Sequence, residues 1–192
     1  IYMGDWSSDV CSSDLARKPL LIGTTALSAQ TLRELDQAAR EIPLLVAPNT
    51  SIGIAVLLEL ARAAARALPQ AFDIEVYEAH HRGKRDAPSG TALALGEVLA
   101  GARGGTLDKQ HAAPGQRGPR RAGQIGFAVV RGGDVPGEHA VCFLGDGEEV
   151  RLEHRVTDRS VFARGAVKAA IWLAGRPPGR YAMRHVLGLG TV

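Results

Sequence analysis

The sequence has little of several features that mark particular classes of protein. Aromatic residues make up only 5% of the 192 residues, so a core has to be built mainly from Ala, Val, Leu and Ile. The two cysteines, Cys11 and Cys142, are too few for the disulfide framework of a small secreted protein. The longest apolar stretch, residues 52–68, is interrupted by three charged residues and is too polar to span a membrane. We therefore expect a globular cytoplasmic protein with no membrane partner.

Common cofactor, metal and nucleic-acid motifs are also missing. The chain has no G-x-G-x-x-G, C-x-x-C or H-E-x-x-H motif, and its histidines lack the spacing of a metal site, so we expect no metal. Residues 104–123 are basic and rich in Gly and Pro, but they lack the interleaved aromatic residues typical of nucleic-acid binding. We expect no nucleic-acid partner, because a loop that closes over an anion or lies at a subunit contact explains these residues equally well.

The first fifteen residues differ from the rest of the chain. They repeat a Ser-Ser-Asp unit and have neither the basic start nor the apolar stretch of a signal peptide. The run from Asp9 to Leu15 resembles translated sequencing-adaptor DNA. We expect residues 1–15 to be an artefact outside the fold, with the natural N-terminus missing.

The apolar pattern predicts an α/β fold whose architecture changes near residue 72. Before that point, apolar strands at 18–22 and 42–47 alternate with amphipathic helices at 28–40 and 51–68, which predicts a parallel sheet. After it, we expect a mostly antiparallel sheet with helices. Its strands are predicted at 72–78, 124–131, 139–144 and 149–157, the last three joined by hairpin-like turns, and its helices at 89–103 and 160–175. A short helix is expected near 183–187.

The densest group of chemically active side chains lies at residues 78–91, directly after a predicted strand. Open α/β proteins place their sites in such loops. His80 titrates near neutral pH and can donate a proton, while Lys84 can hold a carboxylate or supply a proton. The Ser-Gly-Thr at 89–91 begins a helix, whose free N–H groups and dipole attract anions. The group predicts a small anionic ligand such as a carboxylate, and the alternative is a solvated loop before a capped helix.

The segment 75–92, EVYEAHHRGKRDAPSGTA, resembles the signature of the 4-hydroxy-tetrahydrodipicolinate reductase family, formerly called dihydrodipicolinate reductases. The resemblance continues at Arg117 and at residues 123–127, 131–139 and 159–172, and it extends over all of 16–192. It also includes the ends of the two early strands, Gly23-Thr24-Thr25 and Ala47-Pro48-Asn49-Thr50, although Pro48 stands where a small residue is common.

The resemblance implies a reductase that uses NADH or NADPH to reduce an unsaturated cyclic dicarboxylate on the route to diaminopimelate and lysine. It implies His80 as the acid/base residue and Lys84 as a second proton donor or carboxylate partner. Substrate would be bound by His81, Ser89, Gly90 and Thr91. The nicotinamide side of the cofactor would lie against Gly23, Thr24, Thr25, Ala47, Pro48, Asn49 and Thr50, with Arg159 near the cofactor or substrate.

The resemblance also implies a domain plan and an assembly. Residues 16–70 would be the second part of a Rossmann-like nucleotide-binding domain, and 71–175 an α+β domain for substrate binding and oligomerisation. Residues 176–192 would pack back on the nucleotide domain. The full-length protein is expected to be a homotetramer.

The family's Gly-rich phosphate-binding turn is missing from the sequence, so we expect an N-terminally truncated chain with weak NAD(P)H binding and little or no activity. Two alternatives stay open. One is a non-catalytic oligomerisation or binding module that keeps the dicarboxylate pocket, and the other is a reductase of similar layout that acts on another anion.

Overall fold

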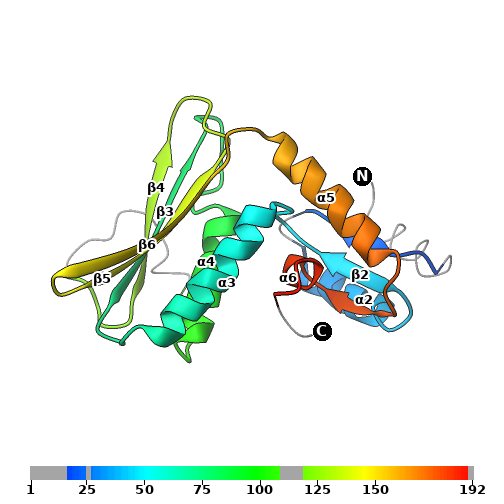
Figure 1. Ribbon diagram of the computed structural model, residues 1–192, viewed down its shortest axis with the longest axis horizontal. Coiled ribbons are helices and arrows are strands. Elements are labelled where there is room, and N and C mark those ends of the chain that lie inside the picture. The colour runs from blue at the N-terminus through cyan, green and yellow to red at the C-terminus, as the bar shows by residue number, and fades with distance from the viewer. Residues whose placement is uncertain (1–16, 25–26, 109–118, 190–192) are drawn as a thin grey trace. The chain divides into compact units, whose positions relative to one another are not determined.

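The computed structural model describes residues 17–24, 27–108 and 119–189, so the predictions for residues 1–15 lie outside it. Two compact units are present (Figure 1). The first runs to Ala55 and resumes at Ser160, and the second is Val56–Arg159. The predicted domain boundaries, at residues 70 and 175, fall about one helix further along the chain in each case. Among the described residues, no helix combines the length and apolar character that crossing a membrane requires.

The first unit is built on a parallel three-stranded sheet with the strand order β1-β2-β7. Its elements are β1 (Leu20–Ile22), α2 (Ala29–Ala38), β2 (Pro43–Val46), the beginning of α3 (Ile52–Ala67), α5 (Ser160–Leu173), β7 (Gly179–Tyr181) and α6 (Met183–Val186). The sequence pattern predicts all of these except β7. The strand was missed because residues 177–179, Pro-Pro-Gly, are typical of a turn.

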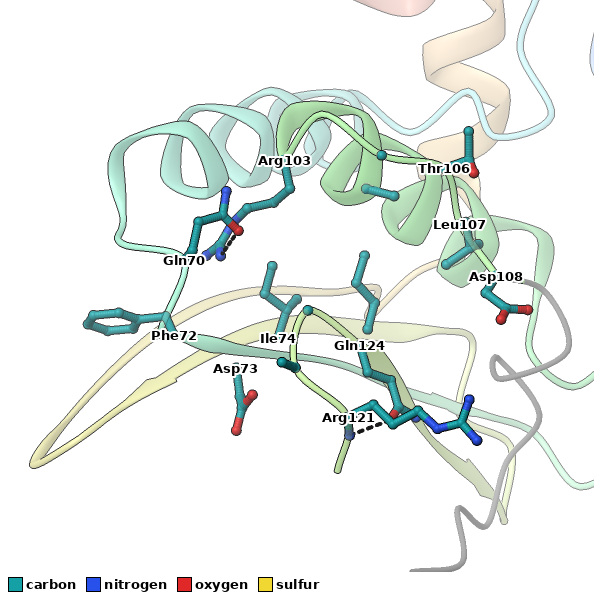
Figure 2. A pocket seen from close by; sticks show the side chains of 15 residues that line it. Gln70, Phe72, Asp73, Ile74, Arg103, Thr106, Leu107, Asp108, Arg121 and Gln124 are labelled. Atoms are coloured by element: carbon teal, nitrogen blue, oxygen red, sulfur yellow. Dashed lines mark hydrogen bonds between the residues drawn. The ribbon is translucent and has the colours of Figure 1, made fainter. Parts of the chain in front are cut away.

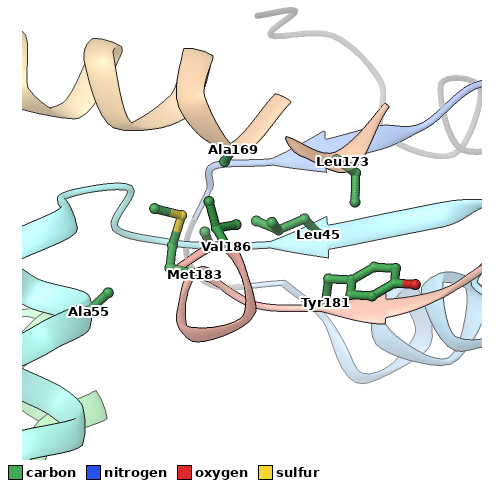
Figure 3. Close-up of a cluster of buried hydrophobic side chains, with 8 residues drawn as sticks. Leu45, Ala55, Ala169, Leu173, Tyr181, Met183 and Val186 are labelled. Carbon is green, nitrogen blue, oxygen red and sulfur yellow. The ribbon is translucent and has the colours of Figure 1, made fainter. Parts of the chain in front are cut away.

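Side chains of β2 alternate between two apolar clusters, one on each face of this sheet. Leu44 packs with residues of β1 and α2, whereas its neighbour Leu45 packs with α5, β7 and α6 (Figure 3). The α5 helix packs closely against the β2–α3 turn at Gly165, where a Cβ would clash with the carbonyl oxygen of Thr50. Thr50 Oγ1 also donates a 2.7 Å hydrogen bond to the Phe162 carbonyl. These contacts fix the turn that follows β2.

The second unit is built on a mixed four-stranded sheet with the strand order β4-β3-β5-β6. Its elements are the rest of α3, β3 (Asp73–His80), α4 (Gly90–Ala102), β4 (Ile125–Arg131), β5 (Glu138–Gly145) and β6 (Glu148–Arg155). The β5–β6 hairpin is confirmed, with Gly147 in its turn at a φ of +83°. The predicted hairpin between β4 and β5 is wrong. The β3 strand lies between them, parallel to β4 and antiparallel to β5, so the sheet is mixed.

The α4 helix covers one face of this sheet (Figure 1) and sets the position of the site. It packs closely because Gly96 has no side chain: a Cβ there would lie 2.7 Å from Phe127 of β4. Ser89 caps the helix, since its Oγ accepts a hydrogen bond from the Ala92 N–H. The N-terminus of α4 therefore lies beside the end of β3.

Candidate functional site

The end of β3 brings together polar residues from three strands of the second unit. Glu78 and His80 are two residues apart and face the same side of the sheet. Strand register places His139 of β5 opposite Glu78, and Arg131 of β4 opposite His80. Ser89, at the start of α4, completes the group by contacting both Glu78 and His139.

Glu78 is the buried centre of this group, with no exposed surface. Its Oε1 accepts hydrogen bonds from the Ser89 N–H at 3.0 Å and from Arg131 Nη2 at 2.7 Å. Its Oε2 lies 3.5 Å from His80 Nδ1 and 3.7 Å from His139 Nε2. Burial alone would raise the pKa of Glu78, but the hydrogen bonds from Ser89 and Arg131 outweigh it and hold the pKa below its usual range. Glu78 is therefore a carboxylate at neutral pH.

The two imidazoles beside Glu78 are neutral at the same pH. Burial lowers the pKa of His80, although the charge of Glu78 opposes this effect, and Lys84 and Arg131 reinforce it. Burial, together with the neighbouring His80, lowers the pKa of His139 to about 4. The rings meet edge to face, with their centroids 5.0 Å apart. An added negative charge nearby would favour protonation of His80.

Lys84 and the first turn of α4 form a separate anion-binding arrangement at the edge of this group. Lys84 Nζ lies 2.7 Å and 2.9 Å from the two carboxylate oxygens of Asp86. Burial alone would raise the pKa of Asp86, but hydrogen bonds from Lys84 and the backbone, including Gly90, lower it. Lys84 and the start of the helix thus hold a carboxylate that belongs to the protein itself.

The remaining residues predicted to bind substrate differ in their access to a ligand. Gly90 is exposed, and Thr91 and His81 are half-buried. Ser89 is 2% exposed, and its N–H and Oγ bond to groups inside the protein. The structure therefore places Ser89 within the buried network and leaves Gly90, Thr91 and His81 at the surface.

The residues predicted to bind the cofactor gather in the first unit, at one edge of the parallel sheet. The ends of β1 and β2 are adjacent, because the Ala47 N–H donates a 2.8 Å hydrogen bond to the Ile22 carbonyl. Gly23 and Pro48 are exposed, and Thr24 and Asn49 are half-buried. Ala47 and Thr50 are buried, the latter through its bond to α5.

Two of the predicted cofactor residues are not among those that the structure places at this edge. Thr25 lies outside the described residues. Arg159 is exposed and is the last residue of the second unit. Its proposed role near the cofactor or substrate therefore stays a prediction.

No site role was predicted for Glu78, Arg131 or His139, although Glu78 begins the predicted group at residues 78–91. The signal for Glu78 was present, because it lies two residues before His80 on a predicted strand. The spacing of the histidines in the sequence predicts no metal site, yet Glu78, His80 and His139 offer ligand atoms within 4.8 Å of one another. Arg131 already neutralises the carboxylate, and a second cation there would be repelled. We therefore keep the prediction of no metal.

A cavity of about 320 Å³ lies in the second unit, at the opposite end of β3 from His80 (Figure 2). Its lining includes Gln70 and Asp73 at the start of β3, Arg103 at the end of α4, and Arg121 and Gln124 before β4. None of the residues predicted to bind substrate or cofactor lines it. Of the basic residues there, Arg103 donates a hydrogen bond to Gln70, and Arg120, next to the lining residue Arg121, pairs with Asp73 and Glu75.

Comparison with known proteins identifies the family. Residues 53–187 match the family model described as "Dihydrodipicolinate reductase, C-terminus". The chain is 52% identical over 172 residues to a 4-hydroxy-tetrahydrodipicolinate reductase from Alkalilimnicola ehrlichii, and 51% identical over 172 residues to one from Caulobacter vibrioides. These alignments cover 88% of this chain, but only 64% and 67% of the two relatives.

A solved structure identifies the same family. The dipicolinate-bound dihydrodipicolinate reductase from Paenisporosarcina sp. TG-14 has a TM-score of 0.73 and 25% sequence identity. The likeness covers 94% of this chain and 69% of that one. The fold class predicted from the sequence is thereby confirmed, and the chain belongs to the dihydrodipicolinate reductase family.

Proposed function

We propose that this chain is part of a 4-hydroxy-tetrahydrodipicolinate reductase, which uses NADPH or NADH to form tetrahydrodipicolinate on the route to diaminopimelate and lysine. The names of its relatives support the reaction, and the dipicolinate bound to the related structure supports a cyclic dicarboxylate as the ligand. The proposed site is the end of β3 with the loop that leads to α4. We keep the cytoplasm as the expected location.

One observation carries the proposal: Lys84 and the first turn of α4 already hold the carboxylate of Asp86. A substrate carboxylate offers the same charge and the same acceptor oxygens, so it can exchange with Asp86 for these donors. Gly90 and Thr91 lie in this turn, and His81 precedes Lys84 in the same loop. These residues form the proposed substrate-binding group, which Ser89 supports from inside.

His80 is the proposed acid/base residue. In the free protein burial keeps the pKa of His80 below its usual value, so its ring is neutral. A dianionic ligand beside the ring would raise that pKa and let His80 take up a proton and deliver it to the ring carbon of the substrate. Lys84 would neutralise a substrate carboxylate or supply a second proton.

The edge of the first-unit sheet is the proposed place for the nicotinamide. Of its exposed residues, Gly23 has no side chain and Pro48 has a compact ring, so a planar ring can approach the backbone here. When bound, the reduced nicotinamide would supply the hydride. The sequence contains no Gly-rich phosphate-binding turn, and we expect the chain by itself to bind NAD(P)H weakly and to have little or no activity.

The decisive experiment is a turnover measurement on a version extended to the full length of the relatives. Replacing His80 by Gln should lower kcat by about 100-fold, the effect typical of losing an acid/base group. The matched control is His154→Gln, a half-buried histidine on β6 of the same sheet, which should leave kcat within about twofold of the parent. A change of less than tenfold in His80→Gln would remove His80 from this role.

The alternative is a non-catalytic module, since a pocket can bind a ligand without turning it over. An extended version that binds the dicarboxylate but shows no NAD(P)H oxidation would favour the module. We propose a homotetramer for the extended protein, which light scattering can test; a monomer at all concentrations would contradict it.

A further inference from the structure

Two buried polar atoms face each other at the centre of the site without any other hydrogen-bond partner. They are Glu78 Oε2 and His80 Nδ1, which lie 3.5 Å apart. The other oxygen, Oε1, is already occupied by the Ser89 N–H and by Arg131. His139 Nε2 lies closer to Ser89 Oγ, at 3.2 Å, than to Glu78 Oε2, at 3.7 Å. The remaining oxygen of Glu78 is thus left for His80.

The second nitrogen of the His80 ring is in a different environment. His80 Nε2 lies beside Gly137, where a Cβ would come within 3.3 Å of it. Because residue 137 is glycine, no side chain covers the nitrogen at this point, and His80 retains 8% of its surface. Nδ1 therefore faces a buried carboxylate, and Nε2 faces Gly137, which has no side chain.

We propose that Glu78 is a positioning residue that holds the His80 ring with its proton on Nδ1, so that Nε2 is the nitrogen that exchanges a proton with the ligand. A carboxylate only accepts hydrogen bonds, so a neutral ring that pairs with it must carry its proton on the facing nitrogen. A slight rotation of the ring would bring Nδ1 and Oε2 into an ordinary hydrogen bond, which is often long in ligand-free sites. This inference rests on the proposed role of His80.

The tautomer of His80 can be measured on the chain as it stands, by long-range ¹H–¹⁵N correlation spectra of the imidazole groups. The spectrum is recorded at pH 7.5, and the His80 signals are identified by their loss in His80→Gln. The expected result is a protonated Nδ1 and an unprotonated Nε2. A dominant Nε2-protonated form of His80 in the unmodified chain would overturn the proposal.

Glu78→Gln provides the second arm of the test. Its single amide oxygen should stay at the Oε1 position, where Ser89 and Arg131 both donate, and its NH₂ group should face His80 Nδ1. The NH₂ group is a donor, so the tautomer should invert to the Nε2-protonated form. The matched control is Glu75→Gln, because Glu75 lies on the same strand and also pairs with an arginine, but faces the other side of the sheet.

An unchanged tautomer in a folded Glu78→Gln variant, or an equal change in Glu75→Gln, would contradict the proposal. The measurement needs neither substrate nor cofactor. A failure of the proposed function, such as turnover that does not depend on His80, therefore appears in a different experiment from a failure of this inference.

Discussion

The β3 strand carries two carboxylate–arginine pairs that share one chemistry and differ in their surroundings. Glu75 pairs with Arg120 at 2.8 Å and Glu78 pairs with Arg131 at 2.7 Å, on opposite faces of the sheet. The Glu75 side chain is 27% exposed, whereas that of Glu78 is completely buried. Only the second pair adjoins two imidazoles and a helix N-terminus. Burial and neighbouring groups, more than the ion pair itself, thus distinguish the candidate site at Glu78 from the structural ion pair at Glu75.

Removing the carboxylate charge from each pair in turn tests whether burial distinguishes them. Glu78→Gln leaves Arg131 with a partly buried, uncompensated charge and should lower the free energy of unfolding by about 3 kcal/mol. Glu75→Gln should lower it by less than about 1 kcal/mol, because that pair is partly exposed and Arg120 keeps a second carboxylate partner, Asp73. Urea unfolding followed by circular dichroism measures both values. Equal losses would show that burial does not distinguish the two pairs.

A smaller effect is expected from pH, because it acts on the histidine beside the buried pair. His139 has a pKa of about 4 in the folded chain and an ordinary value near 6.5 when unfolded. The unfolded chain therefore binds more protons below pH 6.5, and stability falls as the pH is lowered towards 4. His139 alone should account for a loss of about 2 kcal/mol between pH 7 and pH 5.

His139→Gln tests this assignment, since it removes the titrating ring but keeps a polar side chain beside Ser89. The variant should lose distinctly less stability than the parent over the same pH range, measured by the same urea titrations. His80 and His154 also have lowered pKa values and will leave a residual slope. Identical slopes in the parent and the variant would show that His139 does not titrate as proposed.

The parts of the site that could be predicted from the sequence are those whose residues are close together in the chain. His80 at the end of β3, Lys84 in the loop that follows and the start of α4 lie close together in the sequence, so their proximity needs no knowledge of the fold. Arg131 and His139 could not be placed, because their position depends on β3 lying between β4 and β5. A simple hairpin would have joined those two strands. Strand pairing across 50 or more residues leaves no local pattern.

The same distinction explains the outcome for the fold. The βα pairs of the first unit and the β5–β6 hairpin have strong local periodicity and were predicted. The β7 strand lies after two prolines and is only three residues long, and its parallel pairing with β2 links residues 43–45 to 179–181. That pairing forms only in the folded chain, and no local sequence pattern predicts it.

We propose that the end of β3 binds a cyclic dicarboxylate through Lys84 and the first turn of α4. Calorimetric titration of the chain with pyridine-2,6-dicarboxylate, and with pyridine-2-carboxylate as the control, tests it most directly. The dicarboxylate should bind at least about tenfold more tightly, and Lys84→Met should remove most of that difference, because a charge-assisted hydrogen bond is lost. Equal binding of the two ligands, or an unchanged affinity in Lys84→Met, would contradict the assignment of this site.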